Sequence, residues 1–184
     1  MPNNPKLFII SGGRSPSGSD KSDLRTVHSK PIVPRQLCLP YKRVNPHSIV
    51  MVGFQEVTLD RFLGIIDSYC VSRIIDVRVT PLFRGNGFSP DLIDRLLFEK
   101  NVEYIHIPEL GRSNLQYHQE KLSKQFTYPE YVSSCRVLLE DIVKLTENGP
   151  TVMLSWTVKE RESDLRVIVE SLDNLGVDRH AIIA

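Results

Sequence analysis

Short apolar runs alternate with amphipathic stretches from residue 47 onward. Five of these runs have the length and bounds of buried strands: 49–53, 73–77, 102–107, 151–156 and 177–183. Between them, apolar residues recur at three- and four-residue steps, which predicts helices beginning near Thr58, Ser89, Thr127 and Ser163. Strands that alternate with helices favour right-handed crossovers and a parallel sheet. The pattern therefore predicts a three-layer α/β/α fold with a mainly parallel sheet of about five strands.

The helix that begins near Thr127 has the clearest boundaries. Thr127 and Glu130 have the Thr-x-x-Glu spacing of a capping box, and Gly149-Pro150 ends the periodic run. The apolar positions between these signals keep helical spacing through Cys135. We therefore expect one continuous helix here.

The first 46 residues follow no such pattern. They hold seven of the twelve prolines and eight basic residues against two acidic ones, a local charge of +6. This composition predicts an extended or disordered basic arm over residues 1–46, followed by a single α/β domain over residues 47–184. The arm would contact phosphates or an acidic partner, or would be a solvated leader without a ligand. The sequence leaves open whether the apolar piece 7–10 packs on the domain.

Overall composition excludes several classes of protein. The chain is 41% apolar and 24% charged, which is typical of a globular protein, and its net charge of +1 gives no general reason to expect binding to nucleic acid or membranes. No apolar run approaches the length of a membrane span, and the N-terminus has no signal-peptide pattern. We therefore expect a cytoplasmic protein with no membrane partner.

The cysteines give no sign of a metal site. Cys38, Cys70 and Cys135 are widely spaced and odd in number, which predicts reduced structural thiols. No glycine-rich phosphate loop follows the first strand, and no metal-ligand spacing is present. We predict no metal and no cofactor, and the oligomeric state is not predicted.

Polar side chains gather where the predicted strands end. Ligands of open parallel sheets bind outside the carboxyl ends of the strands. The candidates in the loops there are Asp76, Arg78 and Arg84 after the second strand, Glu109 and Arg112 after the third, and Ser155 at the end of the fourth. Guanidinium groups bind oxyanions in a bidentate manner, so the arginines predict a site for phosphate or carboxylate.

The two carboxylates among these candidates have two possible roles. Asp76 and Glu109 would act as general acid–base groups, or would only orient an arginine. Arg78 and Arg84 would bind a ligand, or would only hold their own loop. The sequence alone thus predicts an anion-binding edge and leaves its chemistry open.

The same residues resemble a known family. Asp76-Val77-Arg78 with Pro81 and Arg84, followed by Pro108-Glu109-Leu110-Gly111, is similar to the domain-of-unknown-function 488 proteins. The resemblance covers about residues 48–184 and leaves the arm outside. It implies a small cytoplasmic α/β domain of prokaryotes and their mobile elements, for which no chemistry is established.

Two motifs of the family are replaced in this chain. Family members typically carry Cys-x-Glu at the end of the fourth strand, where this chain has Ser155-Trp156-Thr157. They carry Cys-His-Arg at the start of the last helix, where this chain has Ser163-Asp164-Leu165-Arg166. Serine is a far poorer nucleophile and metal ligand than a thiolate, so thiol or metal chemistry is lost. Arg166 lies one position from the family's arginine and would take over its charge.

Three functions remain open. The lost cysteines and histidine favour a ligand-binding or regulatory module that recognises a phosphate-bearing ligand, either a nucleotide or a nucleic-acid end. The second hypothesis is a hydrolase or transferase-type enzyme acting on such a ligand, with Asp76 or Glu109 as its acid–base group. The third is a nucleic-acid-associated protein that uses the basic arm. The first two require Arg78, Arg84, Glu109 and Arg112 to converge.

Overall fold

A computed structural model describes residues 8–9, 47–112, 114–115, 119, 126–159, 163–175 and 181–183. Within these residues a six-stranded sheet has the order β1-β4-β3-β5-β2-β6. Its strands are β1 (Phe8–Ile9), β2 (Ile49–Gly53), β3 (Arg73–Asp76), β4 (Glu103–His106), β5 (Thr151–Ser155) and β6 (Ala181–Ile183). β2 to β6 run parallel to their neighbours, and β1 pairs antiparallel with β4. The predicted, mainly parallel sheet is confirmed, with one antiparallel strand added at its edge.

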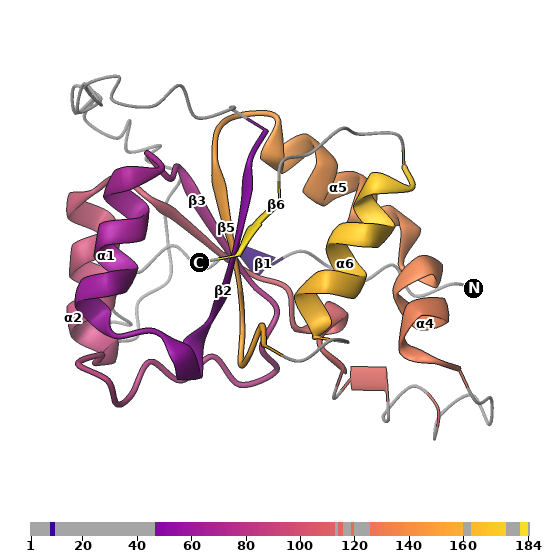
Figure 1. Cartoon of the computed structure of the whole chain (residues 1–184), viewed down its shortest axis with the longest axis horizontal. Helices are drawn as coiled ribbons and strands as arrows, with labels where there is room; N and C mark the ends of the chain where they lie inside the picture. Colours follow the sequence, from indigo (N-terminus) through magenta and orange to yellow (C-terminus); the bar gives the residue numbers. More distant parts are fainter. Residues whose placement is uncertain are drawn as a thin grey trace, which may run out of the picture.

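Helices cover both faces of this sheet (Figure 1). α1 (Leu59–Ser68) and α2 (Pro90–Glu99) lie on one face, and α4 (Tyr128–Ser134), α5 (Arg136–Thr146) and α6 (Asp164–Asp173) lie on the other. Two short 3-10 helices, η1 (Phe54–Glu56) and η2 (Pro108–Leu110), follow β2 and β4. The predicted three-layer arrangement is confirmed.

The central strands β2, β3 and β5 are buried on both faces, which explains their continuous apolar runs. Met51, Ile75, Ile105 and Met153 form one row across the sheet and pack in the core under α4, α5 and α6. The alternate residues, such as Ile74, pack in the core under α1 and α2. Each fully buried aliphatic side chain contributes about 1.5–3 kcal/mol.

The predicted single helix after Thr127 is instead two helices. α4 ends at Ser134 and α5 begins at Arg136, because Cys135 has a non-helical backbone (φ −82°, ψ 34°). The Ser134 hydroxyl donates to the Tyr131 carbonyl at 2.6 Å, and the Cys135 N–H donates to the carbonyl three residues back. A serine side chain that binds its own helix backbone disturbs the regular helical bonds. The apolar spacing of the side chains continues across Cys135. The sequence pattern therefore could not reveal the break in the backbone.

Some predictions fall largely outside the described residues. Only Phe8 and Ile9 of the arm are described, and their backbone pairing with β4 shows that this piece joins the sheet edge. The character of the rest of residues 1–46 stays a prediction. Of the last predicted strand, 177–183, the described part is β6.

The cysteine prediction is wrong in one of the two described cases. Cys70 is disulfide-bonded, whereas Cys135 is free. Burial raises the pKa of the Cys135 thiol, which keeps it protonated. Among the described helices, none combines the length and apolar character that crossing a membrane requires.

Candidate functional site

The topology directs attention to the carboxyl edge of the sheet, at the bottom of Figure 1. β2 and β5 lie side by side there, and the chain leaves them toward opposite faces, to α1 and to α6. In open α/β sheets, ligands bind at such a switch point, outside the carboxyl ends of the strands. Two clusters of side chains lie along this edge, one on each side of the sheet.

The first cluster is built on a buried ion pair. Asp76 ends β3, and Arg78 folds back so that its Nη2 lies 2.7 Å from Asp76 Oδ2 and its Nε lies 3.0 Å from Oδ1. The backbone N–H of Arg78 also donates to Asp76 Oδ1 at 3.0 Å. Both side chains are fully buried. A buried charge needs such a partner together with additional hydrogen bonds.

Aromatic rings surround this pair, which we call the Arg78 cluster. The Arg78 guanidinium carbon lies 4.2, 4.8 and 5.0 Å from the ring centres of Phe54, Phe83 and Trp156. The Tyr104 hydroxyl donates to Asp76 Oδ2 at 2.7 Å. Burial, and then the Asp76 charge, raise the pKa of Tyr104, so its hydroxyl remains a donor.

The Arg78 cluster fixes the loop that follows β3. Arg78 Nη1 donates to the Leu82 carbonyl at 3.3 Å, and His106 Nε2 lies 2.6 Å from the Arg78 carbonyl, to which it can only donate. With its guanidinium buried, bonded to Asp76 and covered by rings, Arg78 has a structural role. A solvent-borne anion cannot reach it in this conformation.

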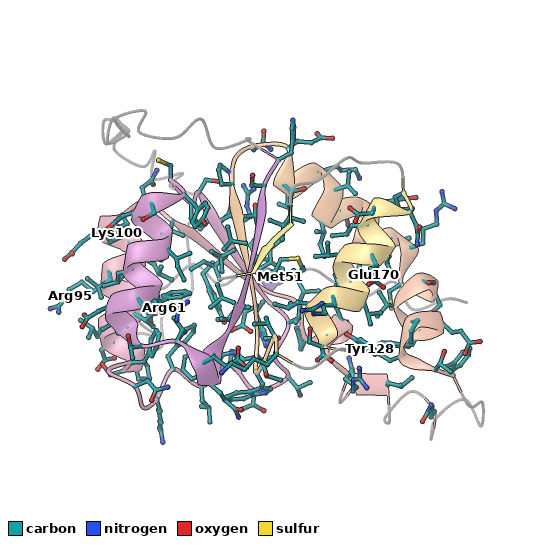
Figure 2. The ribbon with its side chains drawn as sticks, in the orientation of Figure 1. Met51, Arg61, Arg95, Lys100, Tyr128 and Glu170 are labelled. Carbon is teal, nitrogen blue, oxygen red and sulfur yellow. The ribbon has the colours of Figure 1, made fainter. Side chains whose placement is uncertain are left out.

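The second cluster lies at the start of α6, and we call it the α6 cluster. The Arg112 backbone N–H and Nε donate to the two carboxylate oxygens of Asp164, each at 3.2 Å. The Arg112 guanidinium carbon lies 4.8 Å from the centre of the Tyr128 ring. Tyr128 lies between the lower ends of α4 and α6 in Figure 2, and its hydroxyl donates to the Leu110 carbonyl at 2.5 Å.

Two further side chains of the α6 cluster have unsatisfied polar atoms. Ser163 occupies the N-cap position of α6 and is only 3% exposed, yet its hydroxyl makes no capping hydrogen bond. Within the described residues, neither Ser163 Oγ nor Arg166 Nε has a hydrogen-bond partner, and both atoms are buried. Buried polar atoms are nearly always hydrogen-bonded, so these two need an explanation.

The remaining predicted residues are more dispersed. Ser155 is buried and donates to the Thr157 carbonyl at 2.8 Å. The Glu109 backbone carbonyl accepts a hydrogen bond from the Tyr131 hydroxyl, and its side chain is half-buried. Arg84 is exposed, and no hydrogen bond or ion pair within the described part of the chain involves its side chain.

The predicted residues therefore divide between the two faces. Asp76 lies in the same cross-strand row as Leu154, which packs under α1 and α2. Ser155, the next residue along β5, points to the opposite face, where α6 carries Arg166. Across the described residues, no hydrogen bond or ion pair joins Arg78 or Arg84 to Glu109 or Arg112.

The two clusters are nonetheless neighbours along the edge. A Cβ added at Gly111 would lie 2.6 Å from the Val77 carbonyl oxygen and 3.3 Å from Val79 Cγ2. The loop that precedes Arg112 thus packs directly on the loop that contains Arg78. Glycine is required at position 111 because any side chain would collide with that backbone.

Sequence reasoning missed the partners that define each cluster. Tyr104 reaches Asp76 because β3 and β4 pair with Ile74 opposite Tyr104, and a single sequence does not show this register. Ser163 was recognised only as a helix cap. The sequence pattern places Trp156 at the end of the predicted strand 151–156, whereas in the structure β5 ends at Ser155 and Trp156 is partly exposed at this edge. Among the described residues, no three His, Cys, Asp or Glu side chains are grouped so that they could hold a metal ion.

Fold and site together define a doubly wound α/β domain with an arginine-bearing carboxyl edge. The chain belongs to the family called domain of unknown function DUF488, whose model matches residues 58–172, a range that contains the residues of both clusters except Phe54. The resemblance read from the sequence is confirmed. No curated protein and no solved structure gave a significant match.

Proposed function

We propose that this domain is a binding module for a phosphate-bearing ligand, and that the α6 cluster holds the phosphate in place of the joint site of Arg78, Arg84, Glu109 and Arg112 that the sequence hypothesis required. The observation that carries the proposal is the pair of buried polar atoms without partners, Ser163 Oγ and Arg166 Nε. Both can donate a hydrogen bond, and a phosphate oxygen is an acceptor that would satisfy them.

The electrostatics of the α6 cluster support an anion. The N-terminus of α6 carries the positive end of the helix dipole, and first-turn N–H groups that have no partner within the helix. Arg112 and Arg166 contribute positive charges to this cluster, of which Arg112 is bonded to Asp164. Phosphate groups bind readily at helix N-termini with this character.

Binding without turnover is favoured by the position of Asp76. Both of its carboxylate oxygens are occupied, by Arg78 and by Tyr104, and the side chain is inaccessible to solvent. A general base must lie within hydrogen-bond reach of the proton that it removes. Of the two predicted acid–base groups, only Glu109 is partly exposed. A hydrolase or transferase activity would therefore rest on Glu109 alone.

Titration with inorganic phosphate, followed by amide resonances of the full chain, tests the proposal. We expect shifts centred on residues 109–112 and 163–167. Arg166→Gln should weaken binding about tenfold or more, because a hydrogen bond to a charged group is lost. Arg95→Gln is the matched control, since Arg95 is exposed on α2 at the far side of the molecule (Figure 2), and it should bind normally.

Two results would contradict the proposal. Shifts around residues 78–88 without a response in α6 would locate the anion at Arg84 instead. Shifts confined to residues 1–46 would favour the hypothesis of nucleic-acid association through the basic arm.

A further inference from the structure

Trp156 is the only tryptophan of the chain, and it lies at the switch point. It follows β5 directly, and 38% of its surface is exposed. Its exposed part lies at the carboxyl edge of the sheet, where open α/β folds bind their ligands.

The indole is held rigidly. The Arg78 guanidinium lies over its ring at 5.0 Å, and Phe54 contacts it edge-to-face at 5.9 Å between ring centres. The Trp156 carbonyl accepts the Gln55 N–H at 3.0 Å, which fixes its backbone. Arg78 is itself locked by Asp76. A ligand that binds the open part of this ring would therefore lose little affinity to ordering the side chain.

The loop after β3 links the exposed indole to the α6 cluster along the carboxyl edge. Trp156 touches Arg78, the next residue Val79 approaches Gly111, and Arg112 then binds Asp164 at the start of α6. Val79 and Leu82 are also exposed apolar residues of the loop after β3. One edge of the domain thus combines an anion site with an apolar, aromatic surface.

We propose that the phosphate-bearing ligand is a nucleoside monophosphate unit whose base stacks on Trp156. This inference rests on the proposed function, because the α6 cluster supplies the phosphate site. The Arg78 guanidinium already lies over one face of the indole, and its positive charge attracts the π electrons of the ring toward that face. The ring is thereby a poor site for a second cation and a good one for a neutral, polarisable ring such as a nucleobase.

The test compares adenosine 5′-monophosphate with ribose 5-phosphate, which carries the same phosphate without a base. Binding to the full chain is measured by calorimetry and by Trp156 fluorescence, which reports on this position alone because there is one tryptophan. We expect the nucleotide to bind more tightly by about fivefold to 150-fold and to quench the fluorescence. Ribose 5-phosphate should bind without comparable quenching.

Substitutions then assign the difference to the indole. Trp156→Leu should bring the nucleotide to the affinity of ribose 5-phosphate and leave ribose 5-phosphate unchanged, whereas Trp156→Phe should keep part of the difference. Phe98→Leu is the matched control, because Phe98 is 84% exposed on α2, and it should change neither affinity. If Trp156→Leu does not fold, the wild-type comparison and Trp156→Phe still decide the question.

Failure of the inference can be told apart from failure of the proposed function. Equal affinities of the wild type for the two ligands overturn stacking on Trp156 and leave the phosphate site standing. No binding of either ligand or of inorganic phosphate overturns both. If the inference holds, a 5′-phosphorylated oligonucleotide that binds more tightly than the free nucleotide identifies a nucleic-acid end as the source, and equal affinity identifies the free nucleotide.

Discussion

Asp76 and Arg78 illustrate how a residue that resembles a catalytic group can be a structural one. At the end of a buried strand, a carboxylate lacks water and must find donors, and Arg78 and Tyr104 provide them. The attraction within such a buried pair roughly offsets the cost of removing both charges from water. Removing one partner, however, leaves the other charge buried without compensation.

We expect Asp76→Asn to lower the free energy of unfolding by about 3–5 kcal/mol. The amide keeps the shape of the side chain but removes the charge that balances Arg78. Urea denaturation followed by circular dichroism measures the change. Asp94→Asn, an exposed position on α2, is the control and should change stability by less than about 0.5 kcal/mol.

A double variant separates loss of the pair from loss of packing. Asp76→Leu combined with Arg78→Met should be more stable than either single variant, because it leaves no unpaired buried charge. A fully stable Asp76→Asn protein would contradict the structural role. If that protein had also lost a catalytic activity, Asp76 would return as a candidate general base.

At the scale of the elements, the hydroxyl residues ahead of α4 and α6 behave differently. Ahead of α4, the Glu130 carboxylate accepts hydrogen bonds from both the N–H and the hydroxyl of Thr127, each at 2.8 Å. Ahead of α6, the Ser163 hydroxyl makes no capping bond. The same residue class therefore stabilises one helix, while at the other its hydroxyl is buried without a hydrogen-bond partner among the described residues.

Alanine at these two positions should have opposite consequences. Thr127→Ala should cost about 1 kcal/mol of stability, because a cap interaction is lost. Ser163→Ala should be nearly neutral or slightly stabilising, because it removes a buried polar atom without a partner, and it should weaken phosphate binding. Thermal unfolding and phosphate titration of both variants measure the two effects. A Ser163→Ala protein that is much less stable would show that its hydroxyl has a structural partner.

The bond at α4 also depends on pH. The N–H and then the hydroxyl of Thr127 lower the pKa of Glu130 below its usual 4.5. A carboxylate with a lowered pKa stabilises the fold above its usual pKa, and this contribution disappears as the pH falls through the lowered value. The stability difference between wild type and Glu130→Gln should therefore be present at pH 7 and vanish in acid. Glu170→Gln, at an exposed position on α6 (Figure 2), is the control and should show no such dependence.

For the whole molecule, the question is how much the N-terminal segment contributes to the fold. The parallel strands β2 to β5 are covered by helices on both faces, and among the described residues only Phe8 and Ile9 extend the sheet beyond β4. Backbone pairing of two residues at the edge of the sheet contributes little stability in comparison with a core of this size. The arm predicted over residues 1–46 is therefore expected to be dispensable for folding.

Deletion of residues 1–46 should lower the melting temperature by only a few degrees. Thermal unfolding of both proteins by circular dichroism measures the difference in melting temperature. Both are compared in reducing buffer, because Cys70 is disulfide-bonded in the full chain and the deletion removes Cys38. Loss of soluble expression on deletion would show that the segment around Phe8 completes the core.

Local signals in the sequence were sufficient for most of the elements and for their layers, but not for the break at Cys135 or for the edge strand β1. Apolar periods, the capping box at Thr127 and the left-handed Asn101 (φ +52°) after α2 depend on neighbours in the chain. Because connections between parallel strands are right-handed, the alternation of strands and helices is compatible with only a few topologies. The carboxyl edge could be located for the same reason, because parallel strands end on one side.

The grouping of the candidate residues was decided only by the tertiary structure. Asp76, Arg78, Arg112 and Arg166 all reach the edge predicted from the sequence. Strand register, however, directs Asp76 toward Tyr104 on one face, while α6 brings Arg166 to the other. Register and the packing of loops depend on contacts between residues far apart in the chain, and a single sequence does not encode these contacts in any local pattern. The sequence therefore determined where polar groups gather, and the tertiary structure decided which of them are bonded to each other and which lack a partner.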